Sequence, residues 1–582
     1  MIRLFEQHKI RKVTELDGMW DFTMDGFSKS YRLAVPGCFE QHPDFLNHRG
    51  TGVYSRHITM KKDGNLRLDF KGVSHTADVY LDDEKIAHHY NAFTPFSAVV
   101  KHVKKGVHTL RVAVDNTFGQ ASSLHIPNDY YTYGGITRPV ALEEVADVYC
   151  EYLHVTPFKT KDVWHAEIKV LLRNLAPCPK EVTVSCRLLR EDGTPAEATE
   201  KTLSQKVTVP ADSELTVSFL GEYQNVQPWS HSDPVLYHCH VILSEQSGAV
   251  GNTGNTDDMD MDMDIDVDVD DIIERIGFRE ISLSNRQLLV NGEPVFLMGF
   301  NRHEDYASVG CAVPLQLMVQ DMDLMEAAGA NAVRTCHYPN DERFLDLCDE
   351  RGMLVWEESH ARGLSLERME NPNFDTQSEN CIREMIQNHY NHPSVIIWGI
   401  LNECASETEI GRKKYMRQYA QIKSLDKSRP TTSATCRHLK DICLDLPDIV
   451  SFNMYSGWYK DVPVAETNRR EIDWIDASGG AGKPVIVSEL GAASLYGYRD
   501  RGRCKWSEER QADIIRENLE VYMADPDITG VFIWQFADCR VTEEDWFATR
   551  VRCHNNKGVV DEYRRPKLAY DTVSEIFHGF KR

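Results

Sequence analysis

Two glutamates, Glu403 and Glu489, stand at or near the ends of short apolar runs, and such a pair of carboxyl groups can do acid–base chemistry. Residues 395–401 are apolar or glycine and rich in β-branched side chains, which suits a strand buried on both faces. This run ends abruptly in Asn402-Glu403, and residues 484–490 deliver Glu489 in the same way. Hydrolysis of a glycosidic bond needs an acid/base and a partner carboxyl flanking the bond, so the pair predicts that reaction.

From about residue 277 to the end, strand and helix patterns alternate as in a (β/α)₈ barrel, and these elements must position the two glutamates. Helical patterns, such as 315–328, 412–424 and 508–523, separate nearly all of the expected strands. By this count Glu403 ends strand four and Glu489 ends strand seven, at the barrel face where such enzymes place their chemistry. The expected strands are 295–299, 332–335, 353–356, 395–401, 431–435, 449–452, 485–487 and 530–536.

Other polar side chains gather at the predicted strand ends. Each one alone is equally well explained as a hydrogen-bonded structural group. Their shared position at the C-terminal ends of successive strands favours a common site. Because several acidic residues qualify, spacing alone does not select the catalytic pair. The set comprises His303, Glu304, Asp305, His337, Tyr338, Glu357, Glu358, Asn453, Tyr455, Tyr459 and Trp534.

The chain before the barrel is β-rich and predicts two further domains, since 582 residues are too many for one ordinary core. In residues 1–145, short alternating runs are separated by polar turns, which favours a β-sandwich. Residues 146–276 have the size and strand pattern of a small immunoglobulin-like sandwich. The predicted domains are therefore 1–145, 146–276 and a catalytic TIM barrel over 277–582.

An acidic run at 257–271 alternates Asp with apolar residues at period two, which places these Asp side chains on one face of an extended strand. A calcium site is one interpretation, but the run lacks the Gly and terminal Glu of an EF-hand loop. We favour an over-long edge strand followed by a solvated acidic loop, because like charges discourage edge-to-edge pairing.

Composition narrows the range of partners and compartments. A formal net charge of −24 argues against nucleic acid or an anionic membrane as a partner. The first residues lack the apolar core of a signal peptide, and no apolar run is long enough for a transmembrane helix. Fifteen scattered cysteines, an odd count without CxxC pairs, indicate reduced thiols and a cytoplasmic protein.

Five segments in chain order resemble glycoside hydrolase family 2. They are residues 16–22, 299–305, 334–339, 398–403 and 488–489, and the match runs along nearly the whole chain. The resemblance implies an N-terminal jelly-roll domain of the sugar-binding type, an immunoglobulin-like domain and a catalytic barrel. It also implies a retaining mechanism with Glu403 as acid/base, preceded by Asn402, and Glu489 as nucleophile. No metal or organic cofactor is expected.

Within that family, Asn555-Asn556-Lys557-Gly558 resembles the motif by which the bacterial-type β-glucuronidases hold the sugar carboxylate. A Lys ammonium beside an Asn amide can pair with and orient a uronate carboxylate. Without the family context, a lysine on a surface loop is the more common situation. A β-galacturonidase or β-galactosidase of the same family is the alternative, because the sequence does not show which configuration at C4 of the sugar the site accepts. A non-catalytic carbohydrate-binding protein is disfavoured because both glutamates are present.

The resemblance implies further contacts to the sugar. Tyr455 and Tyr459 match two tyrosines that line the family's sugar site, and Asp129 matches a loop that reaches in from the N-terminal domain. For the family's substrate-contacting arginine, Arg550 and Arg552 are both candidates.

A short connection at 359–378 leaves little room for the lid found in several gut bacterial relatives. We therefore expect an open pocket that accepts a bulky or oligosaccharide aglycone, and a homo-oligomer as in related enzymes.

Overall fold

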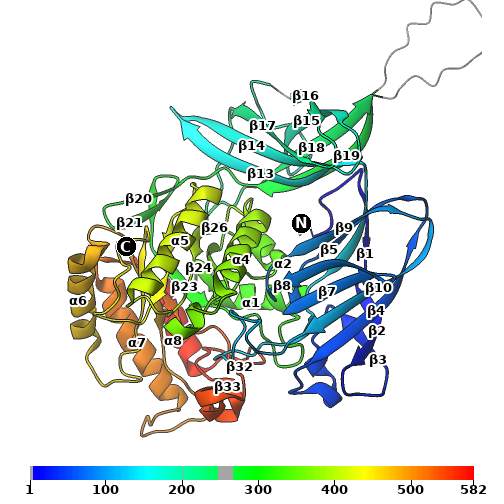
Figure 1. Cartoon of the computed structure of the whole chain (residues 1–582). Coiled ribbons are helices and arrows are strands. Elements are labelled where there is room, and N and C mark those ends of the chain that lie inside the picture. The colour runs from blue at the N-terminus through cyan, green and yellow to red at the C-terminus, as the bar shows by residue number, and fades with distance from the viewer. Residues whose placement is uncertain (1–3, 201, 247–265, 582) are drawn as a thin grey trace, which may run out of the picture.

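The computed structural model describes residues 4–200, 202–246 and 266–581. Figure 1 shows three parts: a β-sandwich at the N-terminus, a second β-sandwich above, and a barrel wrapped by helices. The predicted fold class of jelly-roll sandwich, immunoglobulin-like sandwich and TIM barrel is confirmed. The domain limits 145/146 and 276/277 remain our proposal.

The N-terminal sandwich buries one apolar core between two antiparallel sheets. Trp20, Phe22 and Tyr54 from one sheet meet Leu66 and Leu68 from the other, and all five are buried. The alternation of apolar and polar residues along each strand produces this arrangement, since successive side chains point to opposite faces. One sheet contains β1 (Lys12–Glu15), β12 (Val140–Val145), β5 (Gly64–Phe70) and β9 (Phe96–Val103); the other contains β3 (Tyr31–Val35), β2 (Gly18–Met24), β4 (Thr51–Met60), β10 (Gly106–Asp115), β7 (Thr76–Leu81) and β8 (Glu84–Tyr90).

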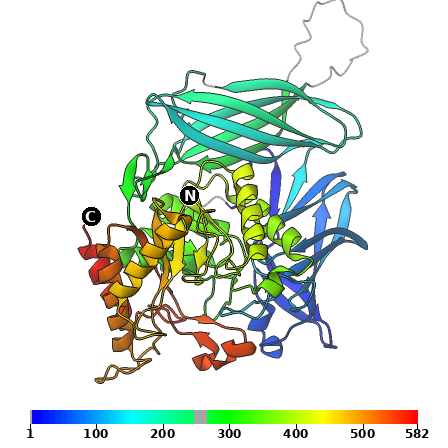
Figure 2. The same cartoon turned by 60° about the vertical axis from the view of Figure 1, so that its left-hand side comes forward.

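The second sandwich packs a three-stranded sheet on a four-stranded one, and Figure 2 shows its long strands lying across the top of the barrel. Its core contains Val148, Ile168, Val184 and Val241. The strands are β13 (Val148–Thr160), β14 (Val163–Asn174) and β17 (Glu214–Tyr223), then β16 (Leu203–Val209), β15 (Lys180–Arg190), β18 (Tyr237–Gln246) and β19 (Asp266–Ile276).

The end of the acidic run lies in β19, which is an edge strand as predicted. The solvated interpretation is wrong for its last two residues, because Asp270 and Asp271 are fully buried. Asp270 pairs with Arg11, whose Nε donates to Oδ1 at 2.9 Å. Asp271 accepts hydrogen bonds from the backbone N–H groups of Lys9 and Ile10 at 2.8 and 2.9 Å. These carboxylates tie the N-terminal segment to the second sandwich; residues 257–265 lie outside the described residues.

The barrel closes through a divided fifth strand. Its parallel sheet has the order β27-β26-β25-β24-β23-β31-β30-β29-β28, and β27 and β28 are separated in the chain by Ser433 alone. The strands are β23 (Leu297–Asn301), β24 (Ala332–Thr335), β25 (Leu354–Glu358), β26 (Val395–Gly399), β27 (Thr431–Thr432), β28 (Ala434–Thr435), β29 (Val450–Asn453), β30 (Val485–Leu490) and β31 (Ile528–Ile533).

Helices cover the outside of the barrel and bury their apolar faces against it, as the 3.6-residue pattern predicts. They are α1 (Leu315–Ala327), α2 (Glu342–Arg351), α3 (Leu366–Met369), α4 (Phe374–His389), α5 (Glu409–Leu425), α6 (Val464–Ile475), α7 (Glu508–Ala524) and α8 (Leu568–Gly579). A small antiparallel sheet, β20 (Ile281–Ser284), β21 (Gln287–Val290) and β22 (Glu293–Val295), precedes the first barrel strand. Among the residues described, no helix is both long and apolar enough to cross a membrane.

Candidate active site

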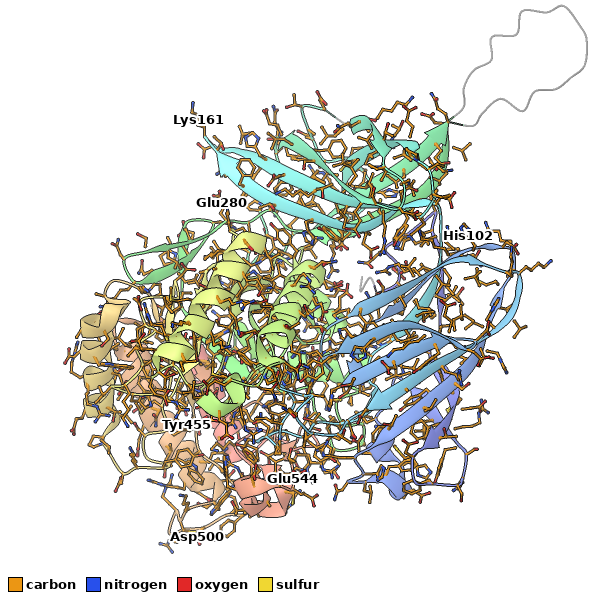
Figure 3. All side chains as sticks on the ribbon, in the orientation of Figure 1. His102, Lys161, Glu280, Tyr455, Asp500 and Glu544 are labelled. Carbon is orange, nitrogen blue, oxygen red and sulfur yellow. The ribbon has the colours of Figure 1, made fainter. Side chains whose placement is uncertain are left out.

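A cavity of about 400 Å³ opens at the C-terminal ends of the barrel strands. Figure 3 places Tyr455, one of its lining residues, at this end of the barrel. Seven of the ten predicted site residues line the cavity: Asp129, Glu403, Tyr455, Tyr459, Glu489, Trp534 and Lys557. Side chains from three distant stretches of sequence therefore meet at one place.

A tight turn after β26 presents Glu403. The strand ends at Gly399, two residues earlier than predicted, because Leu401 and Glu403 adopt φ values of +49° and +53°. Such left-handed conformations are costly for residues other than glycine and mark functional turns. The Glu403 N–H donates to the Ala434 carbonyl oxygen at 2.8 Å, and Asn453 Nδ2 donates to Glu403 Oε1 at 2.9 Å. The turn and these contacts hold the carboxyl group at the barrel mouth.

Glu489 is the next-to-last residue of the barrel strand β30. Arg334 Nη1 donates to its Oε1 at 3.0 Å, and the Tyr455 hydroxyl donates to its Oε2 at 2.6 Å. Both donors favour the ionised carboxylate, since hydrogen bonds and opposite charge stabilise the charged form. Glu489 is therefore arranged to act as an anion.

Arg334 connects most of the polar groups around Glu489. Its guanidinium forms two 3.0 Å hydrogen bonds with the Glu358 carboxylate, a bidentate arrangement. It also donates to Asn402 Oδ1 at 2.8 Å and to Asn301 Oδ1 at 2.9 Å. The sequence placed Glu358 in the set of polar residues at the predicted strand ends and Arg334 in a family-like segment, but it gave neither residue a role. The feature of the sequence that could have identified both residues as part of the site is a charged side chain at or near the end of an apolar strand.

Burial and the neighbouring charge of Glu403 raise the pKa of Glu489 to about 7, while Arg334 and Tyr455 oppose this rise. The Glu489 carboxyl group is therefore ionised mainly above about pH 7.

Lys557 provides a buried positive charge inside the cavity. The residue is only 1% exposed, and its ammonium lies 5.5 and 5.3 Å from the ring centroids of Tyr455 and Tyr459. In the described parts of the chain, no carboxylate oxygen lies within 4 Å of this ammonium. The two tyrosines do not neutralise this buried charge, and a buried charge without an oppositely charged partner is unfavourable, so the geometry favours an anionic ligand group at this point.

Asp129 links the N-terminal domain to the same part of the cavity. Its Oδ1 accepts from Arg550 Nε at 2.9 Å, and its Oδ2 accepts from Asn555 Nδ2 at 3.0 Å. Arg550 lines the cavity, whereas Arg552 forms an ion pair with Glu562. Of the two arginines that the sequence left open as substrate contacts, Arg550 is the one that lines the cavity.

The other three predicted residues are buried beside the cavity rather than lining it. Asn555 orients Asp129, and Asn402 accepts from Arg334. His303 Nδ1 lies 3.1 Å from the Tyr338 hydroxyl, and its ring meets Trp534 edge-on with centroids 5.4 Å apart. Several lining residues were not singled out from the sequence. Cys436 directly follows β28 at a predicted strand end, and the others lie on loops or helices without a strand-end pattern: Arg362, His438, Arg470 and Trp546.

One buried group, Asp346, Asp349 and His392, has the spacing of a possible metal site. However, Arg275 Nη2 lies 2.9 Å from Asp346 and 3.6 Å from Asp349. A guanidinium already neutralises these carboxylates, so the group is better explained as a buried ion-pair network.

Two carboxyls at the C-terminal mouth of a barrel are the arrangement that many glycosidases use, and the family models assign the chain to that class of enzymes. The chain belongs to glycosyl hydrolases family 2. The TIM barrel model of that family matches residues 281–582, its galactose-binding domain-like model matches 48–143, and a third family 2 model matches 148–256.

Several known proteins are similar over nearly the full length. The β-glucuronidase of Pongo abelii is 32% identical over 98% of this chain and 92% of its own, and that of Streptococcus agalactiae is 26% identical over 96% and 95%. The crystal structure of a GH2 β-galacturonidase from Eisenbergiella tayi bound to galacturonate is 45% identical. It covers 100% of both chains with a TM-score of 0.92.

Proposed function

We propose that the protein is a retaining exo-β-uronidase that releases β-D-glucuronic acid from glucuronides. The observation that carries this proposal is the buried Lys557 ammonium, which has no carboxylate partner in the described structure and lies beside Tyr459 in the catalytic cavity. A C6 carboxylate would supply the missing charge. Similarity to named β-glucuronidases over the whole chain supports it further.

The reaction would be a double displacement. The Glu489 carboxylate attacks the anomeric carbon while the bond from that carbon to the aglycone oxygen breaks, and Glu403 gives its proton to the departing oxygen. Glu403 then takes a proton from water, whose oxygen attacks the anomeric carbon. Glu489 leaves as a carboxylate, and the sugar is released with its original anomeric configuration.

A β-galacturonide is the second candidate substrate, because the Eisenbergiella tayi β-galacturonidase is 45% identical. Both sugars carry the same carboxylate at C6 and differ only at C4, so Lys557 and Asn555 suit either one. A cytoplasmic location and a homo-oligomeric state remain predictions beside this function.

A comparison of kcat/KM on p-nitrophenyl β-D-glucuronide, β-D-galacturonide and β-D-galactoside tests the proposal. We expect the glucuronide to be the best substrate and the galactoside the worst, because only uronides pair with Lys557. A lead for the galacturonide would keep the uronate site and change the sugar. A lead for the galactoside would refute the uronate assignment.

The activity should fall below about pH 7. Glu489, the proposed nucleophile, has its pKa raised to about 7, and its protonated carboxyl group cannot attack the anomeric carbon. We expect kcat/KM for the preferred uronide to decrease about tenfold per pH unit on that side. Activity that stays flat from about pH 7 down to about pH 5, with the fold intact by circular dichroism, would contradict this role of Glu489.

A further inference from the structure

Two cysteines meet across the contact between the N-terminal sandwich and the barrel. Cys38 follows β3 in the sandwich, and Cys311 lies in the loop between β23 and α1 of the barrel. Their sulfur atoms are 3.6 Å apart, although the two residues are 273 positions apart in the chain. All fifteen cysteines are free thiols in the structure, so the packing of two domains alone brings this pair together.

On the sandwich side, hydrogen bonds fix the chain around Cys38. The Phe39 N–H donates to the Gly134 carbonyl oxygen at 2.9 Å. In return the Glu40 carboxylate accepts from the Gly134 N–H, at 2.8 Å to Oε1 and 3.0 Å to Oε2. Cys38 is therefore fastened to the loop from which Asp129 reaches the catalytic cavity.

On the barrel side, a tight turn presents Cys311. The Gly310 N–H donates to the Tyr306 carbonyl oxygen at 2.9 Å, and Gly310 has a φ of +58°, which glycine adopts easily. The Cys38 thiol also lies 3.6 Å from the Val309 carbonyl oxygen in this turn. Both sulfurs are thus carried by loops, which can absorb the small side-chain rotation that brings two sulfurs to a bonding distance of about 2 Å.

Solvent access distinguishes this pair from another close pair of cysteines. Cys311 is half-buried, so a small oxidant can reach its sulfur, and Cys38 behind it is 4% exposed. Cys186 and Cys239 in the second sandwich have sulfurs 3.4 Å apart, but both lie in the core and are 1% and 0% exposed. Of these two pairs, only Cys38 and Cys311 combine proximity with a thiol open to solvent.

We propose that Cys38 and Cys311 form an oxidation site at which hydrogen peroxide joins the two thiols into a disulfide. The Cys311 thiolate attacks one peroxide oxygen, so that an S–O bond forms, the O–O bond breaks, and the hydroxide that leaves takes up the proton lost by Cys311. The Cys38 sulfur then attacks the resulting sulfenic sulfur, the S–S bond forms, and the S–O bond breaks. The second oxygen leaves with the Cys38 proton as water. Both cysteines are oxidised, and the peroxide is reduced to two water molecules.

The disulfide should form slowly and then hold the two domains together. The hydrogen bond with Cys38 and burial raise the pKa of the Cys311 thiol well above its ordinary value, so little reactive thiolate is present near neutral pH. Once formed, the bond links positions 273 residues apart and restricts the unfolded chain. It fastens the sandwich to the barrel beside the loop that carries Asp129.

The test treats the reduced full-length protein with excess hydrogen peroxide, alkylates the remaining thiols in denaturant with iodoacetamide, and maps the peptides by mass spectrometry. We expect a pair of peptides joined through Cys38 and Cys311, with Cys186 and Cys239 still alkylated. The apparent unfolding temperature should rise by at least about 4 °C. Dithiothreitol should reverse both the link and the rise.

Cys311→Ser should abolish the linked peptides and the rise in unfolding temperature. The turnover of the preferred p-nitrophenyl uronide by the reduced variant should equal that of the wild type, because the thiol is outside the cavity. Cys178→Ser is the matched control: Cys178 is exposed and lies between β14 and β15, so its loss should leave both the link and the rise unchanged. The peptide map of the wild type does not depend on the folding of either variant.

Cys38 and Cys311 that remain alkylated at a peroxide dose that oxidises Cys178 would overturn the site. Sulfinic acid at Cys311 without a link to Cys38 would overturn it as well, and so would an equal yield of the link from protein unfolded in urea. None of these results depends on the sugar that is hydrolysed, so the proposed function is tested separately.

Discussion

Replacing Glu489 by glutamine should lower kcat on p-nitrophenyl β-D-glucuronide by at least about 10⁴-fold. The amide is nearly the same size as the carboxylate and keeps partners in Arg334 and Tyr455, but it cannot form the glycosyl ester. The loss therefore reports chemistry rather than packing. Steady-state kinetics, with the unfolding temperature as a check on the fold, measures it.

Rescue by azide separates the roles of the two glutamates. In Glu489→Ala, azide fills the vacated space and attacks from that face, so the product should be the α-glycosyl azide. In Glu403→Ala with p-nitrophenyl β-D-glucuronide, the p-nitrophenolate is a good leaving group and still departs without protonation by an acid. Azide then attacks the glycosyl ester from the opposite face, and the product should be the β-glycosyl azide. The reverse pair of products, identified by NMR, would exchange the assigned roles.

Replacing Lys557 by methionine should reduce kcat/KM on the glucuronide by about 10²-fold or more. The methionine side chain keeps much of the volume of a residue that is 1% exposed, but it removes the charge that we pair with the C6 carboxylate. Loss of one partner from a buried, hydrogen-bonded charge pair costs about 2–5 kcal/mol. On p-nitrophenyl β-D-glucoside, which lacks the carboxylate, the change should be far smaller.

Lys505→Met provides the control for removing a lysine. Lys505 also packs against an aromatic ring, with its ammonium 4.3 Å from the Trp458 centroid, but it does not line the cavity. Its replacement should leave both substrates unaffected. An equal loss on glucuronide and glucoside in Lys557→Met would mean that Lys557 supports the site without binding the uronate.

The barrel strands, and the two glutamates as candidates near their ends, were predictable because these signals are local, whereas the choice of this pair among several acidic residues came from the family resemblance. A buried parallel strand is an apolar run of five to seven residues, and a carboxylate at its end needs no distant partner to be recognised. Positions 395–399 and 485–490 both follow that rule. The exact strand ends were harder to predict, since the left-handed turn at Leu401 and Glu403 is stabilised by contacts with other strands.

The tertiary structure alone decided which polar groups act together. Arg334 joins Glu358, Asn402 and Glu489, which are separated by up to 155 residues from one another or from Arg334, and no spacing rule connects them. Likewise the choice of Arg550 depends on Asp129, 421 positions away in another domain.

In the acidic run at 257–271, too, the secondary structure was predictable from the sequence and the charge pairing was not. Its period-two pattern correctly predicted an edge strand, because pattern and strand are both local properties. The burial of Asp270 and Asp271 was not predictable, since it depends on Arg11 and the backbone N–H groups beside it, about 260 residues earlier. The sequence by itself determined most of the elements and, through its resemblance to the family, the two carboxyls that we propose as catalytic. Only the folded chain decided how charges are paired, because pairing depends on distance in space rather than along the sequence.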